Sequence, residues 1–121
     1  MPEIGDGAFA GVLDKGTLDA LNCGDTADRD CAEMCAEVSR VLSPGGIYMM
    51  VTSHPPQSRY RLIADTAYGW AVHVYEVGQQ GACEGPHTIS PLAGDDEKGL
   101  AALGLPRMPY SHFVYVCRKA K

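Results

Sequence analysis

The feature that most constrains the fold is a pair of short apolar runs separated by an amphipathic segment. The first run, at residues 9–14, holds Phe9, Val12 and Leu13 and ends at an aspartate. This pattern is typical of a short buried strand. The second run, at residues 47–52, is apolar almost throughout, as in parallel strands that helices cover on both faces. We therefore expect an α/β fold with both strands in its sheet.

The segment between the two runs has the periodicity of one helix. Its apolar residues recur three or four positions apart, which places them on a single helical face. Asp30 and Glu33 have the spacing of a capping box and predict a firm helix start at Asp30. Pro44, Gly45 and Gly46 predict its end. The apolar positions are Ala27, Cys31, Met34, Cys35, Val38, Val41 and Leu42.

The second half of the chain predicts one further helix and two further strands. Two prolines can open a helix at 55–67, where the apolar residues keep helical spacing. Alternating β-branched and aromatic residues predict strands at 70–77 and 112–117. The stretch at 78–109 holds six glycines and four prolines. It predicts a long loop, with at most a helical turn at 100–103, inside a single domain spanning residues 1–121.

Composition limits the classes of partner. The chain has 121 residues, of which 45% are hydrophobic, and this is enough for one buried core. Its formal net charge is −5, and it has no run of basic residues of the kind that binds nucleic acid. We expect no nucleic acid partner, and a basic protein surface suits this charge better.

The sequence also favours an intracellular, cytoplasmic protein. It has no apolar stretch near the roughly 20 residues that a membrane helix needs, and its first residues do not resemble a signal peptide. We expect no membrane association. The five cysteines are an odd number in a chain large enough to fold without disulfides, so reduced thiols are the expectation.

Two cysteines lie four residues apart and raise the question of a metal site. Cys31 and Cys35 belong to the apolar face of the helical segment, where cysteine packs as a small hydrophobic residue. The four histidines are scattered, without the spacing of metal ligands. We therefore predict that both cysteines lie in the core and that the chain has no metal site.

The first candidates for a functional site follow the first strand. In open α/β sheets ligands bind at the carboxyl ends of the strands, where Asp14, Lys15, Gly16 and Thr17 are expected. A second interpretation is that Asp14 and Asp19 cap the turn after the strand. Lys15 fits a pocket role and a structural ion pair equally well, and the sequence does not separate the two.

Three motifs carry a resemblance to a known family. They are Asp14-Lys-Gly-Thr-Leu-Asp-Ala-Leu21, Glu37-Val-Ser-Arg-Val-Leu-Ser-Pro-Gly-Gly46 and Ala67-Tyr-Gly-Trp70. Over residues 8–77 and 112–119 the chain resembles the C-terminal half of class I S-adenosylmethionine-dependent methyltransferases. It is most similar to the methyltransferase-like family that modifies lysines of translation elongation factor 1-alpha, including the domain encoded beside endothelin-converting enzyme.

The resemblance implies a partial Rossmann-like sheet with flanking helices. In that family the strand order is 3-2-1-4-5-7-6, with the last strand antiparallel. Residues 9–14 would be strand four, 47–52 strand five, 70–77 strand six and 112–117 strand seven. The expected order is therefore 4-5-7-6, without strands one to three and without the glycine-rich cofactor loop that accompanies them.

The same resemblance implies a function. The chain would be part of a protein-lysine N-methyltransferase that uses S-adenosyl-L-methionine, with elongation factor 1-alpha as the suggested protein substrate. We expect this part alone to be inactive. The alternative is a non-catalytic interaction module that keeps the methyltransferase scaffold.

Family roles can be carried to individual residues. Asp14 would be catalytic by orienting the lysine amine, and Asp14, Lys15 and Gly16 would contact the cofactor. Lys15, Thr17 and His54 would contact the substrate.

The absence of strands one to three has one further consequence. It would expose the backbone edge of the strand at residues 9–14, and unpaired edges promote association. We therefore expect a homodimer through this edge, or pairing with a separate chain that carries the missing half.

Overall fold

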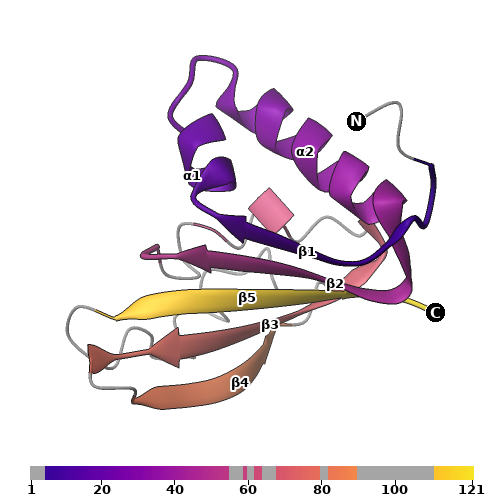
Figure 1. Ribbon diagram of the computed structural model, residues 1–121. Coiled ribbons are helices and arrows are strands. Elements are labelled where there is room, and N and C mark those ends of the chain that lie inside the picture. The colour runs from indigo at the N-terminus through magenta and orange to yellow at the C-terminus, as the bar shows by residue number, and fades with distance from the viewer. Residues whose placement is uncertain (1–4, 55–58, 60–61, 64–67, 80–81, 90–110) are drawn as a thin grey trace.

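The described chain forms a five-stranded sheet with two helices on one of its faces (Figure 1). The computed structural model describes residues 5–54, 59, 62–63, 68–79, 82–89 and 111–121. The elements in chain order are β1 (Phe9–Lys15), α1 (Thr17–Leu21), α2 (Ala27–Val41), β2 (Leu42–Thr52), β3 (Trp70–Val77), β4 (Cys83–Ile89) and β5 (His112–Lys119).

The order of the strands across the sheet is β1-β2-β5-β3-β4. β1 and β2 are parallel, whereas β5 is antiparallel to both of its neighbours, β2 and β3. The strands β1, β2, β5 and β3 therefore lie side by side in the predicted order 4-5-7-6, and β5, the last in chain order, is antiparallel to its neighbours. This prediction is confirmed. Because β5 is the last strand in sequence and lies in the middle of the sheet, residues from both ends of the chain share one core.

The prediction of a loop over 78–109 was wrong at residues 83–89, which form the strand β4. Residues 83–89 pair antiparallel with β3, from Val72 beside Ile89 to Val77 beside Cys83. The glycine and proline in this segment obscured the strand, and both are tolerated in an edge strand. Gly85 is required there, because a Cβ atom would lie 2.9 Å from the carbonyl oxygen of Val74. The turn predicted at 100–103 lies outside the described residues.

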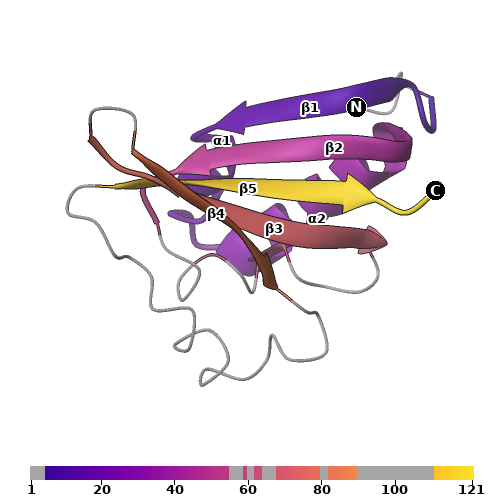
Figure 2. The ribbon, with the colours of Figure 1, turned by 90° about the horizontal axis from the view of Figure 1, so that it is seen from below.

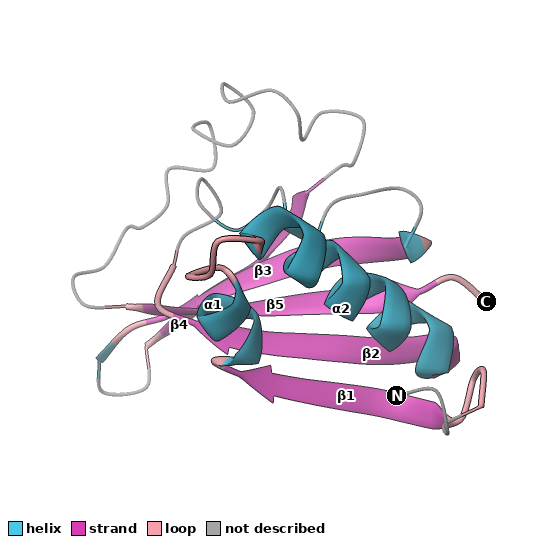
Figure 3. Ribbon diagram, turned by 90° about the horizontal axis from the view of Figure 1, so that it is seen from above, coloured by secondary structure: helices cyan, strands magenta, loops and turns pink. Residues whose placement is uncertain are grey.

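The core lies between the sheet and the two helices (Figure 3). Alternate residues of β2, β3 and β5 point toward the helices, as the two-residue period of a strand requires. Cys31 and Cys35 lie in this core at 1% and 0% exposure, which confirms their predicted packing role. Trp70 stacks near Tyr48 and Tyr68, with ring centroids 5.6 and 5.3 Å away, and its indole donates to the carbonyl of Ile63 (2.7 Å).

Helix α2 begins earlier than the predicted capping box. Its N-cap is Thr26, and the amide of Asp30 already donates to the carbonyl of Thr26 (2.9 Å). The prediction of a start at Asp30 was therefore wrong, because Asp30 belongs to the regular hydrogen bonding of the first turn. The Thr26 hydroxyl also donates to the Asp30 carboxylate (2.7 Å), so that side chain is used within the turn.

Helix α2 ends at Val41, and β2 follows directly. The Lys119 ammonium, at the end of β5, donates to the carbonyl oxygens of Ser39 (2.7 Å) and Leu42 (2.8 Å). A cation at a helix C-terminus satisfies terminal carbonyls and complements the helix dipole. β2 begins at Leu42, ahead of the predicted start at Ile47, because Leu42 already pairs with Phe9.

One other predicted element differs from the structure, and a second is described only in part. Residues 17–21 form the short helix α1, where the sequence predicted only a turn. Within the predicted helix at 55–67, the described residues Arg59, Leu62 and Ile63 are helical, and the rest of that prediction lies outside the described residues.

The face of the sheet away from the helices is more exposed than the apolar sequence of β2 predicts. Figure 2 shows the sheet from this side, with both helices behind it. Among the described residues the large hydrophobic side chains that are exposed are Phe9 (42%), Leu13 (71%) and Met49 (37%). All three come from β1 and β2. The described helices therefore cover one face of these strands, although the sequence predicted cover on both.

Candidate active site

The predicted site residues meet at one edge of the sheet. β1 and β2 are parallel and in register, with Asp14 beside Met50 and Lys15 beside Val51. Their carboxyl ends therefore lie side by side. Gly16 and Thr17 follow β1, and His54 follows β2, so the structure brings these residues to the same edge, where ligands bind in open α/β sheets.

Asp14 is buried and fully engaged with the protein. Its side chain lies on the helix side of the sheet at 3% exposure. One carboxylate oxygen accepts the amide of Thr17 (2.7 Å), and the other accepts the amide of Leu18 (3.1 Å) and the hydroxyl of Tyr48 (2.7 Å). These contacts cap the first turn of α1 and fit the interpretation of Asp14 as a turn cap.

Tyr48 is a permanent donor to this carboxylate. Burial raises the pKa of its hydroxyl far above the ordinary value, and the hydrogen bond to Asp14 and the negative charge of Asp14 raise it further. The proton therefore stays on Tyr48 at every physiological pH. A direct contact between the Asp14 carboxylate and a lysine substrate stays a prediction.

Gly16 sets the path of the chain from β1 into α1. Its φ is 100°, a left-handed conformation that side chains other than glycine rarely adopt. A Cβ atom at this position would meet nothing within 4 Å, so the backbone borders open space. The site therefore has a stretch of bare backbone at the end of β1, which a ligand can approach closely.

Lys15 and Thr17 flank this glycine and are exposed. Within the part of the chain that the structure describes, the Lys15 ammonium forms no ion pair. The structural bridge that the sequence left open for Lys15 is therefore absent from these residues. Among the described residues, the Lys15 ammonium at the rim of the site therefore has no carboxylate partner.

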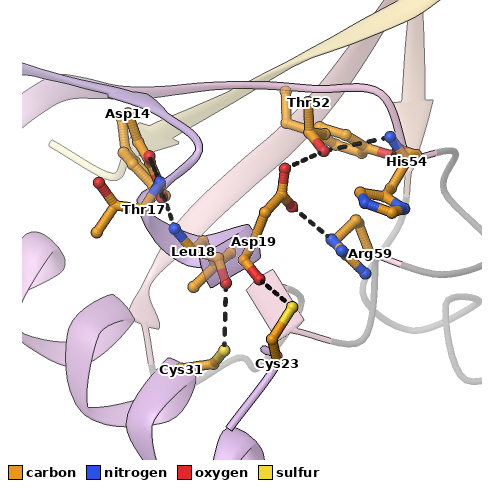
Figure 4. Close-up of polar contacts among 11 residues, drawn as sticks. Asp14, Thr17, Leu18, Asp19, Cys23, Cys31, Thr52, His54 and Arg59 are labelled. Atoms are coloured by element: carbon orange, nitrogen blue, oxygen red, sulfur yellow. Dashed lines mark hydrogen bonds and ion pairs between the residues drawn. The ribbon is translucent and has the colours of Figure 1, made fainter. Parts of the chain in front are cut away.

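A second polar cluster, which the sequence did not predict as a site, lies beside the first (Figure 4). The Asp19 carboxylate accepts the hydroxyl of Thr52 (2.6 Å) and the Nε–H of Arg59 (2.8 Å). Arg59 and Thr52 are 5% and 3% exposed. This Asp19 cluster joins the first turn of α1 to the end of β2 and to the segment beyond it.

Asp19 is held in its charged form by this cluster. Partial burial raises its pKa, but the hydrogen bonds from Thr52 and Arg59 outweigh that effect, and the charges of Arg59 and His54 add to them. The pKa is therefore below its ordinary value. The 40 positions between Asp19 and Arg59 leave no local pattern that signals such a pair, so sequence reasoning missed both roles.

His54 is positioned by its backbone. Its amide donates to the Thr52 hydroxyl oxygen (3.2 Å), and its carbonyl accepts the hydroxyl of Tyr115 (2.9 Å). The side chain is half-buried and lies beside Arg59 in Figure 4. The structure thus places His54 at the predicted edge, separated from the turn at Gly16 by the Asp19 cluster.

No metal centre is found at this edge or elsewhere in the described ranges, since they contain no group of three or more metal-ligating side chains. None of the described helices is long and apolar enough to cross a membrane.

Comparison with known proteins gives relatives in one functional class. No family model matches the chain. It is 36% identical over 74 residues to mouse EEF1A lysine methyltransferase 4, a match that covers 54% of this chain and 29% of that protein. It is 35% identical over 72 residues to human mitochondrial citrate synthase-lysine N-methyltransferase, covering 60% of this chain and 29% of that one. The matched region thus spans 29% of the length of each of these curated relatives.

Solved structures show the same fold at low sequence identity. A DNA modification methylase from Thermus thermophilus, in complex with S-adenosyl-L-methionine, superposes with a TM-score of 0.57 at 12% identity. The match covers 99% of this chain and 49% of that one. The [4+2]-cyclase SpnF gives a TM-score of 0.51 at 17% identity and is covered to 52%. This chain therefore resembles lysine methyltransferases in sequence over part of their length, and it resembles a methylase solved with S-adenosyl-L-methionine in its fold.

Proposed function

We propose that this chain is part of a protein-lysine N-methyltransferase that uses S-adenosyl-L-methionine. The observation that carries the proposal is the turn at Asp14–Thr17, which pairs bare backbone at Gly16 with an exposed ammonium at Lys15. The names of the lysine methyltransferase relatives support the choice of a lysine side chain as methyl acceptor. Elongation factor 1-alpha is the protein substrate that the name of mouse EEF1A lysine methyltransferase 4 suggests.

The residues at the turn suit the proposed cofactor. The bound cofactor supplies an electrophilic methyl group on a positively charged sulfur, and its methionine part carries a carboxylate. The Lys15 ammonium can pair with such a carboxylate. Gly16 lets a ligand lie against the backbone, because no atom of the described residues comes within 4 Å of the place where a Cβ would stand. Asp14 acts here as a positioning residue, since its carboxylate holds the amides of Thr17 and Leu18.

Positioning is the main task of this site. Methyl transfer needs a neutral amine in line with the methyl group, so correct placement and exclusion of water contribute more than strong acid–base groups. Thr17 at the start of α1 and His54 after β2 form the proposed substrate side. The Asp19 cluster fixes the distance between these two segments, because it bonds α1 to Thr52 and Arg59.

A chimeric enzyme tests this proposal. A segment of mouse EEF1A lysine methyltransferase 4 that contains its matched residues is replaced by residues 8–119 of this chain, and transfer of tritiated methyl groups to elongation factor 1-alpha is measured. We expect transfer, and we expect Lys15→Met to weaken binding of S-adenosylhomocysteine on the order of tenfold, as the loss of one charge-assisted contact implies.

The matched control is Arg118→Met, which removes an exposed cation at the far end of the sheet. It should leave binding unchanged. A folded chimera that binds no S-adenosylhomocysteine would refute the proposal and would favour the non-catalytic scaffold.

A further inference from the structure

Two aspartates at the candidate site differ in how far a substrate can reach them. Asp14 ends β1 and Asp19 lies in the first turn of α1, so both are at the carboxyl edge of the parallel strands. Asp14 is 3% exposed, whereas 24% of the Asp19 side chain is exposed. A ligand that arrives from solvent therefore reaches the Asp19 carboxylate first, and reaches Asp14 only if the turn moves.

The two carboxylates also differ in the hydrogen bonds that they can still accept. An ionised carboxylate offers about four acceptor positions. Asp14 already accepts two amides of α1 and the hydroxyl of Tyr48. Among the described residues, Asp19 accepts one bond on each oxygen, from the Thr52 hydroxyl and the Arg59 Nε–H. Asp19 therefore keeps acceptor capacity on a carboxylate that is partly exposed.

The Asp19 carboxylate lies between the two sides of the proposed site. Its helix α1 begins directly after Gly16, and its side chain is bonded to Thr52 at the end of β2 (Figure 4). His54 follows Thr52 and is near enough for its charge to help lower the pKa of Asp19. Asp19 is thus placed between the turn proposed for the cofactor and the segment proposed for the substrate.

The ion pair with Arg59 gives this carboxylate a charge balance that suits the reaction. Methyl transfer requires a neutral amine, and a carboxylate without a counter-charge would keep the amine protonated by raising its pKa. The Arg59 Nε lies 2.8 Å from the Asp19 carboxylate, and Arg59 is buried. Its positive charge offsets the negative charge of Asp19. Asp19 can therefore accept a hydrogen bond from a neutral amine without strongly favouring the ammonium form.

We propose that Asp19 is the carboxylate that binds and orients the side-chain amine of the substrate lysine, in place of Asp14. The inference rests on the proposed function for the identity of the substrate. It changes the role that the sequence resemblance implies for Asp14, which caps the turn that carries Asp19. Asp14 then acts through Asp19 as a positioning residue, and Asp19 is the residue that touches the substrate.

Carbon-13 NMR of the aspartate carboxyl groups tests the proposal in the full chain, without any substitution. The probe is Nα-acetyl-lysine methylamide, and the matched probe is the norleucine compound, which lacks the amine. We expect the lysine probe to shift the Asp19 signal saturably, with an affinity on the order of tenfold above that of the norleucine probe. The Asp14 signal should not respond.

Asp30 provides an internal control in the same spectra. Its carboxylate also lies in the first turn of a helix, accepts a threonine hydroxyl (2.7 Å, from Thr26) and is 30% exposed. Non-specific attraction of a cation to surface carboxylates would shift the Asp30 signal as much as that of Asp19. We expect no saturable shift at Asp30.

Kinetics of the chimeric enzyme give a second measurement. Asp19→Asn should raise KM for the protein substrate on the order of tenfold and leave KM for S-adenosyl-L-methionine unchanged, because only the contact with the amine is lost. Asp30→Asn is the matched control and should change neither KM. A merely structural role of Asp19 would reduce kcat through loss of folded enzyme and leave KM for the protein substrate as in wild type.

Three results would overturn the proposal. They are an Asp19 signal that does not distinguish the lysine probe from the norleucine probe, a saturable response at Asp14 without one at Asp19, and an unchanged KM for the protein substrate in a folded Asp19→Asn chimera. A chimera that transfers no methyl group, while Asp19 of the full chain selects the lysine probe, would support the amine site and refute the proposed function instead.

Discussion

Tyr48 of β2 donates its hydroxyl to the buried carboxylate of Asp14 on β1, at 2.7 Å. This bond crosses the parallel pair of strands at the base of the turn that leads into α1. Removing it with Tyr48→Phe keeps the ring and takes one donor from a buried carboxylate. We expect a loss of about 1.5–3 kcal/mol in the free energy of unfolding, measured by urea titration.

The control for this substitution is Tyr75→Phe, on the other face of the sheet, where the ring is half-buried. It should change the free energy of unfolding by less than about 0.5 kcal/mol. Equal stability of Tyr48→Phe and wild type would mean that the hydroxyl does not support the Asp14 turn.

Gly16 should resist replacement for a conformational reason. Its φ of 100° is strained for any other residue, although space for a side chain is open. Gly16→Ala should therefore lower the free energy of unfolding by about 1–2 kcal/mol. Gly24→Ala is the matched control, because its Cβ would make only an ordinary contact of 3.7 Å with the carbonyl of Leu21. If both variants are equally stable, the backbone strain does not decide the choice of glycine.

Asp19 predicts how stability changes with pH. The pKa of Asp19 is lower in the folded state than in the unfolded state, where it is about 4. The Asp19 cluster therefore stabilises the fold fully above the unfolded-state pKa, and this stabilisation is lost as the pH falls through the folded-state pKa. Asp19→Asn should therefore have a lower free energy of unfolding than wild type at pH 7, and this gap in free energy between variant and wild type should become smaller at acidic pH.

Chemical denaturation at several pH values measures this gap. Asp25→Asn, at an exposed position in the turn between the helices, is the control and should leave the free energy of unfolding at pH 7 within about 0.5 kcal/mol of wild type. A gap for Asp19→Asn that stays constant from neutral to strongly acidic pH would contradict the role of the Asp19 cluster.

The cysteines should divide into two classes by reactivity. Cys23 and Cys83 are exposed, whereas Cys31, Cys35 and Cys117 are buried. Burial raises the pKa of Cys35 to about 12, with smaller contributions from Cys31 and Asp14. Because the thiolate is the nucleophile, iodoacetamide at mildly alkaline pH should modify the two exposed thiols of the native chain and all five of the unfolded chain, as read by mass spectrometry. Rapid native labelling of Cys35 would contradict the packing of α2 against the sheet.

The sequence predicted those parts of the fold that depend on local pattern. The apolar runs at 9–14 and 47–52 and the alternation at 70–77 indicated the central strands, and the apolar face of residues 27–42 indicated α2 and the burial of Cys31 and Cys35. The β4 strand was missed because Gly85 and Pro86 argue against a strand, and its pairing partner lies in another segment.

The candidate site was predicted only in part for the same reason. The position of Asp14, Lys15 and Gly16 at a strand end follows from local sequence and from the resemblance. The roles of Tyr48, Thr52 and Arg59 depend on contacts across 33 to 40 residues. Such contacts are decided by strand order and register, and no single segment of sequence shows them.

The central place of β5 has a consequence for the order in which the protein can be made and folded. β5 separates β2 from β3, and its last residue, Lys119, holds the end of α2. During synthesis β2 and β3 leave the ribosome before β5, so they emerge with a gap between them at the middle of the sheet. Until β5 fills this gap, the nascent chain presents two unpaired strand edges to chaperones.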